Sequence, residues 1–71
     1  MTDERLLKLM GRRVHDLRKK AKLTQEDMMS YGFERRYYQR IESGTVNLSL
    51  KSLNKLAKVF GLSVAELMKF E

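Results

Sequence analysis

Residues 34–44 read Glu-Arg-Arg-Tyr-Tyr-Gln-Arg-Ile-Glu-Ser-Gly, and this stretch decides the expected fold. In a helix, at about 100° per residue, Tyr38 and Ile41 lie on one side. The opposite side carries long cationic and amide groups and one hydroxyl, from Arg36, Gln39, Arg40 and Ser43. Such groups suit base edges and phosphates, whereas an ordinary solvated helix more often alternates Lys with Glu. We interpret the stretch as a DNA recognition helix; the alternative is a solvated helix face.

The composition indicates one small domain over residues 1–71, without covalent or metal cross-links. The chain has no Cys, and His15 is its only imidazole, which excludes disulfides and zinc fingers. We expect His15 at the surface or the core boundary, with no ligand or base role. No apolar run approaches the ~20 residues that cross a bilayer, and no signal peptide is evident. We therefore expect a cytoplasmic protein without a membrane partner.

The charge of the chain predicts a polyanionic partner. The net charge is +6 and the isoelectric point is near 9.9. Residues 1–23 hold eight Lys/Arg against three acids, and a second basic group comprises Arg35, Arg36 and Arg40. Two basic elements around a neutral middle suit a protein that docks in a groove. For Lys19, Lys20 and Lys22 we expect a general role in solubility and long-range attraction.

The first half of the chain predicts three helices. One covers about residues 3–21, with an apolar stripe at steps of three and four: Leu7, Met10, Val14, Leu17 and Ala21. Thr24 is the expected cap of a short helix over about residues 25–30. Residues 31–33 form a turn, in which Phe33 is expected in the core together with Met28. A third helix over about residues 34–43 ends at Gly44.

Two more helices complete the predicted all-α, compact five-helix fold. Ser49 is the expected cap of a helix whose stripe comprises Leu50, Leu53, Leu56, Ala57 and Phe60. Gly61 ends it. Ser63-Val-Ala-Glu66 is a capping box that begins a last helix containing Leu67, Met68 and Phe70.

The central unit covers about residues 24–43. It consists of a short helix, a tight turn that contains Gly, and the Arg-rich helix. This arrangement is typical of a helix-turn-helix, whose second helix lies in the major groove.

The sequence resembles the Cro/repressor family of helix-turn-helix proteins, also called the XRE family, over about residues 11–68. The resemblance is carried by Leu17-Arg18, Leu23 to Asp27, Arg35 to Gly44, Asn47 to Leu53 and Leu56 to Ser63. Within the family, the Arg-x-Tyr-x-x-x-Ile-Glu and Asn-Leu-Ser-Leu-Lys-Ser-Leu segments look most like the controller proteins of restriction–modification systems. The resemblance implies a lambda-repressor-like fold.

The sequence departs from the family pattern in four places. The stretch from Gln25 to Glu42 is one residue shorter than usual. Met29 stands where a small residue is common, and Leu48 where Pro is common. Glu34 replaces the usual Ser or Thr cap of the recognition helix.

The resemblance also implies the residues that touch DNA. Base-edge contacts fall on Arg35, Arg36, Gln39 and Arg40. Phosphate contacts fall on Gln25, Ser43, Thr45 and Asn47. Tyr37 would touch a phosphate or a thymine methyl, or else cover the turn after the second helix. Arg18 and Glu42 would form a buried ion pair with a scaffold role, the alternative being two separate surface charges.

The apolar tail indicates a homodimer. Leu62, Val64, Leu67, Met68 and Phe70 exceed what one short helix buries. They either all pack back on the first and fourth helices, or Leu67, Met68 and Phe70 form part of a two-fold contact. We favour the dimer, because paired helix-turn-helix units gain affinity.

Together these features predict a bacterial or phage-encoded regulator, associated with the nucleoid through sequence-specific binding of double-stranded DNA. It would bind an inverted repeat as a homodimer and repress or activate according to operator position. The alternative is an antitoxin or another protein-interaction module with the same fold. We expect no enzyme, since paired carboxylates in a cleft, Cys and phosphate-binding glycine loops are missing. We also expect no cofactor, metal or small-molecule ligand.

Overall fold

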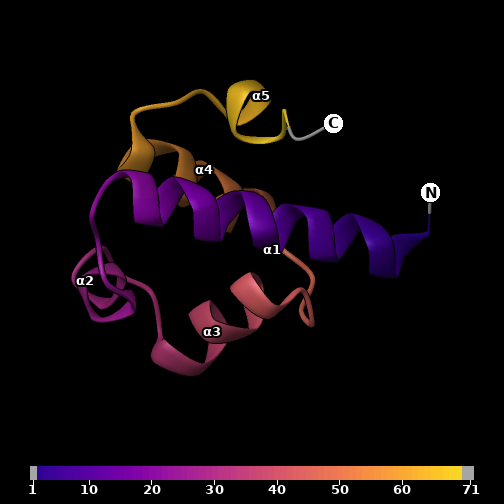
Figure 1. Ribbon diagram of the computed structural model, residues 1–71, viewed down its shortest axis with the longest axis horizontal. Coiled ribbons are helices and arrows are strands. Elements are labelled where there is room, and N and C mark those ends of the chain that lie inside the picture. Colours follow the sequence, from indigo (N-terminus) through magenta and orange to yellow (C-terminus); the bar gives the residue numbers. More distant parts are fainter. Residues whose placement is uncertain (1, 70–71) are drawn as a thin grey trace.

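The computed structural model describes residues 2–69, and in this range the chain is helical without strands. The helices are α1 (Asp3–Lys20), α2 (Gln25–Met29), α3 (Arg35–Ser43), α4 (Leu50–Phe60) and α5 (Val64–Leu67). Figure 1 shows α2 and α3 on one side of α1 and α5 on the other, with α4 running alongside α1. The predicted all-α, five-helix fold is confirmed.

Hydroxyl side chains begin four of the helices. The caps are Thr2, Thr24, Ser49 and Ser63, and each accepts a hydrogen bond from the backbone N–H three residues later. The carboxylate of Asp27 accepts a hydrogen bond from the N–H of Thr24, and that of Glu66 accepts one from the N–H of Ser63. These bonds complete two capping boxes. Local side-chain chemistry therefore sets where these helices start.

Glu34 begins α3 in place of the usual Ser or Thr. Its carboxylate accepts hydrogen bonds from the N–H of Tyr37 at 2.8 Å and of Arg36 at 3.0 Å. These two backbone bonds lower the pKa of Glu34 below its ordinary value. The departure from the family pattern at this position is thus a change of capping group that keeps the start of the helix.

The core lies where all five helices meet. Its buried apolar side chains are Met10, Val14, Met28, Phe33, Tyr38, Ile41, Leu53, Leu56, Ala57 and Leu67. The rings of Phe33 and Tyr38 pack edge to face, with centroids 5.5 Å apart. The predicted inward positions of α3 and the core positions of Met28 and Phe33 are confirmed.

The helix boundaries and stripes differ from the predictions at three places. Ala21 is the exposed C-cap of α1, because the chain turns away from the core there. Leu50 is 80 % exposed, because the first turn of α4 extends past the buried cluster. The last helix ends at Leu67 with Met68 as its C-cap, and Phe70 lies outside the described residues.

Two glycines allow α1 and α3 to approach closely. A Cβ on Gly11 would lie 2.5 Å from the carbonyl oxygen of Ile41 and 2.6 Å from that of Glu42. Gly44 ends α3 with a φ of +73°, and a Cβ there would lie 2.7 Å from Cα of Lys8. Helix α3 therefore lies against the backbone of α1 at both glycines.

Long cationic side chains hold the outer elements in place. Arg13 donates from α1 to the carbonyl oxygens of Leu67 at 3.1 Å and Glu66 at 2.9 Å, at the end of α5. Lys55 donates from α4 to the carbonyl of Gly32 at 2.9 Å, and its ammonium lies 5.0 Å from the centre of the Phe33 ring. These contacts link α5 to α1, and α4 to the turn before α3.

Substitution of Gly11 by Ala tests the close approach of α1 and α3. In an exposed helix interior this change stabilises by about 0.5–1 kcal/mol. Here the new methyl meets two backbone carbonyls, so we expect the free energy of unfolding to fall by about 1–3 kcal/mol in urea titrations. The control is Arg12→Ala, at the exposed neighbouring position, with an expected change within about 0.5 kcal/mol. A stabilised Gly11→Ala variant would contradict this packing.

Candidate nucleic-acid interface

The two faces of α3 have opposite environments. Tyr38 and Ile41 are 0 % and 1 % exposed, whereas the side chains predicted to face DNA are all exposed: Arg36, Gln39, Arg40 and Ser43. The structure thus assembles, on one helix, a row of guanidinium, amide and hydroxyl groups directed to solvent. These are the groups that recognise base edges and phosphates.

A buried ion pair fixes α3 to α1. Arg18 Nε donates to Glu42 Oε2 at 2.6 Å, and the two side chains are 7 % and 6 % exposed. Arg18 Nη2 lies 3.3 Å from Glu42 Oε1, so the contact is two-pronged. Arg18 Nη1 also donates to the carbonyl of Leu23 at 2.8 Å. The two residues implied as a scaffold pair are therefore in direct contact, and Arg18 holds the segment before α2 as well.

Three further groups converge on the Glu42 carboxylate. The Tyr38 hydroxyl donates to Oε2, His15 Nδ1 lies 2.9 Å from Oε1, and Gln25 Nε2 donates to Oε1 at 3.3 Å. Glu42 is thus bonded to side chains from α1, α2 and α3. Sequence reasoning missed His15 and Tyr38 as members. The spacing of His15 three residues before Arg18, and of Tyr38 four before Glu42, places each on the same helix side as its neighbour.

The network controls the ionisation of its members. Burial raises the pKa of Glu42, whereas hydrogen bonds from Arg18, Tyr38 and His15 lower it. The hydrogen bonds together have the larger effect, and the pKa falls to about 2. The bond to Glu42 raises the pKa of Arg18, against the effect of burial. Burial, followed by the bond to Glu42, raises the pKa of the Tyr38 hydroxyl far above its ordinary value. At neutral pH the cluster therefore holds a carboxylate, a guanidinium and a neutral phenol.

Arg35 differs from the other arginines of α3, because an acid on α2 engages it. Its Nη1 donates to Glu26 Oε1, and its Nη2 donates to Glu26 Oε2 at 2.8 Å. The side chains are 57 % and 64 % exposed, so the pair lies at the surface. Sequence reasoning placed Arg35 among the base contacts and did not identify Glu26 as its partner.

Among the implied phosphate contacts, Gln25, Ser43 and Thr45 have partners within the protein. The side-chain amide nitrogen of Gln25 donates one hydrogen to Glu42. The same nitrogen carries a second hydrogen that can donate to another acceptor. The Ser43 hydroxyl donates to the carbonyl of Arg40 at 3.1 Å and lies 2.9 Å from the Thr45 hydroxyl. Asn47 is exposed in the loop that follows. Ser43, Thr45 and Asn47 lie at or after the C-terminal end of α3, and Gln25 contacts Glu42 in its last turn.

Tyr37 connects α3 to α4. Its ring is half-buried, and its hydroxyl lies 2.9 Å from Ser52 Oγ. The ring therefore packs against the edge of the core, and its hydroxyl contacts α4.

The helix pair, the exposed cationic face and the buried Arg–Glu pair can be compared with known families. A family model described as helix-turn-helix matches residues 14–67, about three quarters of the chain. The chain belongs to the helix-turn-helix family. The match is of the Cro/repressor type, and this family consists of DNA-binding regulators. No curated protein matches the chain.

The segment between Gln25 and Glu42 of this helix-turn-helix protein begins with a short α2. That helix has five residues and is followed by the turn that contains Gly32, with a φ of +92°. Met29, where small residues are common, is half-buried and packs at the edge of the core. Leu48 is also half-buried against the core. The exposed face of α3 remains accessible despite these departures.

The residues implied in a dimer contact have different environments. Leu67 is 0 % exposed and belongs to the core of the monomer, so its assignment to a dimer interface is wrong. The reason is that α5 packs with this side chain directed into the core, while Arg13 bonds the backbone carbonyl oxygens of Glu66 and Leu67. Met68 is 42 % exposed, and Phe70 lies outside the described residues.

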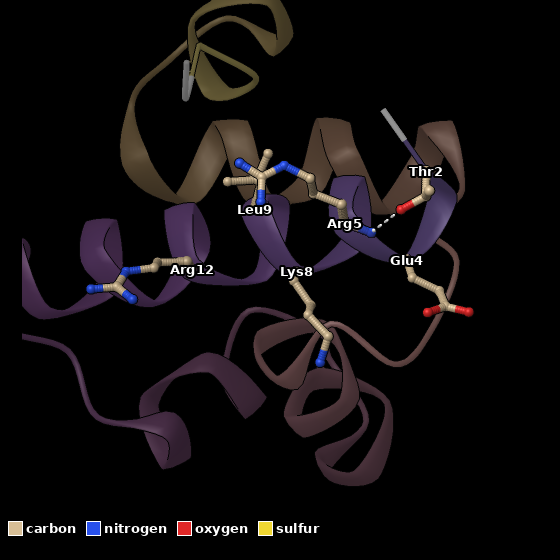
Figure 2. Close-up of a pocket in the computed structure, with 6 residues that line it drawn as sticks. All are labelled: Thr2, Glu4, Arg5, Lys8, Leu9 and Arg12. Atoms are coloured by element: carbon tan, nitrogen blue, oxygen red, sulfur yellow. Dashed lines mark hydrogen bonds between the residues drawn. The ribbon is translucent and has the colours of Figure 1, made fainter.

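The outer face of α1 carries a shallow depression of about 370 Å³. Figure 2 shows it lined by Thr2, Glu4, Arg5, Lys8, Leu9 and Arg12, with Lys8 pointing from α1 toward α3. All of these residues come from one helix and its cap, so the depression is a space between side chains on a convex surface. Among its lining residues, Lys8 places a positive charge beside Gly44, the C-cap of α3.

Two kinds of feature are absent from residues 2–69: a membrane-spanning helix and a cluster of metal ligands. No helix there is both long and apolar enough to cross a membrane. In the same range, His, Asp and Glu side chains do not gather in the groups of three that hold a metal ion.

The pKa of Glu42 predicts how stability depends on pH. The folded-state pKa of about 2 lies below the ordinary value of 4.5, so the stabilisation is complete above about pH 4.5 and is lost as the pH falls through about 2. Replacement of Glu42 by Gln should lower the free energy of unfolding by about 3 kcal/mol near neutral pH. The difference from wild type should shrink steadily below pH 4.5.

Urea unfolding of both proteins across this pH range measures that difference. The control is Glu4→Gln, an exposed carboxylate on α1, for which stability should change little at any pH. A difference for Glu42→Gln that stays constant with pH would contradict an ionised, hydrogen-bonded Glu42.

Proposed function

We propose that this helix-turn-helix protein is a sequence-specific regulator of transcription that inserts α3 into the major groove of double-stranded DNA. The observation that carries the proposal is the division of α3 into a buried face and an exposed face. Tyr38 and Ile41 fix the first, and Arg36, Gln39 and Arg40 form the second. The ion pair of Arg18 and Glu42 keeps the exposed face at one orientation. The whole chain acts as one DNA-binding domain.

The exposed side chains divide into two roles. Arg36 and Arg40 read guanine through O6 and N7, and Gln39 reads adenine through N6 and N7. Gln25, Ser43, Thr45 and Asn47 contact phosphates of the DNA backbone, and Tyr37 adds a further phosphate contact. Phosphate contacts position the protein and do not carry sequence information. Arg35 is a further base contact, which forms only when Glu26 releases it.

Two copies of the protein bind an inverted repeat. A groove of about 210 Å³ lies between α1, the loop after α3 and the end of α5, lined by Leu6, Leu7, Met10, Asn47, Leu48, Leu53 and Met68. Leu50 adds an exposed side chain one turn before Leu53 on α4. The apolar side chains of this groove supply the two-fold contact together with Leu50, and Met68 is the residue of the predicted dimer contact that lines it. The two α3 helices would then lie about 34 Å apart, one turn of DNA.

Selection from a pool of random DNA duplexes tests the proposed function. The protein is expected to enrich an inverted repeat and to bind it at least about a thousandfold more tightly than unrelated duplex at moderate salt. Enrichment of no sequence would contradict the regulator and would favour the alternative, a protein-interaction module such as an antitoxin.

Arg36→Ala tests base reading. Wild-type protein should lose about 1–3 kcal/mol of binding free energy when the base pair facing Arg36 is changed, and the variant should lose almost none at that pair. Fluorescence anisotropy on single-substituted operators measures these values. The control is Lys58→Ala on α4, which should leave the pattern intact. A uniform loss across all sequences would instead make Arg36 a phosphate contact.

The pair of substitutions Leu50→Glu and Met68→Glu tests the two-fold contact. Placing charges on this apolar surface should shift the protein from dimer to monomer in sedimentation at micromolar concentration. Tyr31→Glu is the control, since Tyr31 is 47 % exposed and lies outside the groove. A wild-type protein that is monomeric and binds the repeat without cooperativity would contradict the dimer.

A further inference from the structure

Glu26 and Arg35 form an ion pair at the edge of the surface proposed to bind DNA. Arg35 is the first residue of α3, and Glu26 is the second residue of α2. Both oxygens of the carboxylate are engaged by the two terminal nitrogens of the guanidinium. This is the planar, two-pronged geometry that a guanidinium also offers to guanine.

We propose that Glu26 is a specificity-determining residue, which keeps Arg35 from binding phosphates and releases it only to guanine. The inference rests on the proposed function, since it assumes that α3 enters the major groove. It gives Glu26 a role although its carboxylate would not itself touch a base.

The exposure of the pair makes the exchange possible. Both side chains are more than half exposed, at 57 % and 64 %, and exposed ion pairs change an equilibrium constant by about fivefold at most. A two-pronged contact between Arg and guanine discriminates by about fivefold to 150-fold. Guanine therefore competes successfully for Arg35, whereas a base that offers no pair of acceptors leaves the guanidinium on Glu26.

The ion pair also reduces binding to unrelated DNA. A free Arg in this position would contact a phosphate on any sequence and displace about one counterion. While Arg35 is paired with Glu26, its charge is neutralised and that contribution is lost. The neighbouring Arg36 and Arg40 differ: among the residues 2–69 that the structure describes, their side chains act on the Glu34 carboxylate only through longer-range charge. Glu26 thus lowers non-specific affinity more than specific affinity.

A double-mutant cycle on DNA of unrelated sequence tests this. The slope of log K against log salt should become steeper by about 0.9 in Glu26→Gln, as expected for one more phosphate contact, with a severalfold gain in affinity. Arg35→Ala alone should leave the wild-type slope unchanged. Combining the two substitutions should remove the gain seen in Glu26→Gln.

The matched control is Glu4→Gln, which removes the same charge from an exposed position on α1. If it produced the same steepening as Glu26→Gln, a general charge effect would explain the result and the proposal would be overturned. Thermal unfolding of each variant shows whether it is folded, and the Glu26 and Arg35 variants should unfold within a few degrees of wild type because the pair is exposed.

The selected operator supplies the second readout. In Glu26→Gln the ratio of specific to non-specific affinity should fall, and the preference for guanine at the pair facing Arg35 should weaken severalfold. An unchanged ratio, or a loss of non-specific affinity in Arg35→Ala alone, would overturn the role of Glu26 while leaving the proposed function intact. Conversely, if no operator is enriched, the proposed function fails, and the salt slopes still decide whether Glu26 restrains Arg35.

Discussion

The arrangement of α1, α2 and α3 depends on one buried carboxylate, that of Glu42. Its two oxygens are bonded to Arg18 and His15 of α1, to Gln25 of α2, and to Tyr38 of its own helix. A carboxylate with an exposure of 6 % is costly to bury unless its hydrogen-bonding capacity is satisfied. Among the described residues, no buried side-chain nitrogen or oxygen lacks a partner. The position of α3 is therefore the one at which all of these bonds form together.

This constraint acts together with the close packing of backbones. Gly11 and Gly44 bring α3 against α1, so that the buried face of α3 has little freedom to slide or rotate. A buried ion pair adds less to stability than to the definition of geometry. The base contacts that we propose would depend on this geometry, because a bidentate contact requires the side chain to enter the groove at a defined angle.

The surface of α3 shows a second level of organisation. Arg36 and Arg40 are exposed on the helix, whereas Arg35 is paired with Glu26 on α2. Three arginines that are nearly equivalent in sequence thus differ in their electrostatic surroundings. A set of unrestrained arginines would bind any duplex strongly, and non-specific binding competes with the operator throughout a genome. Under the role that we propose for Glu26, the paired Arg35 keeps a base contact while this competition is limited.

Local sequence features were sufficient to predict most of the fold. The caps Thr24, Ser49 and Ser63 and the glycines at 44 and 61 act on backbone groups within a few residues, so the helix ends follow from the sequence. Periodicity likewise placed Tyr38 and Ile41 in the core. It failed for Leu50 and Ala21, because a periodic stripe shows which side of a helix is apolar but not how far the core extends along it.

The site divides in the same way. The sequence by itself determined that α3 carries a cationic, amide-bearing face opposite an apolar one, since this depends only on helical geometry. Only the tertiary structure decided that Arg35 pairs with Glu26, that His15 and Gln25 contact Glu42, and that Leu67 is buried. Each of these contacts joins residues of different helices, and their distances depend on how the helices pack. That packing is the sum of many weak contacts, which no local pattern encodes.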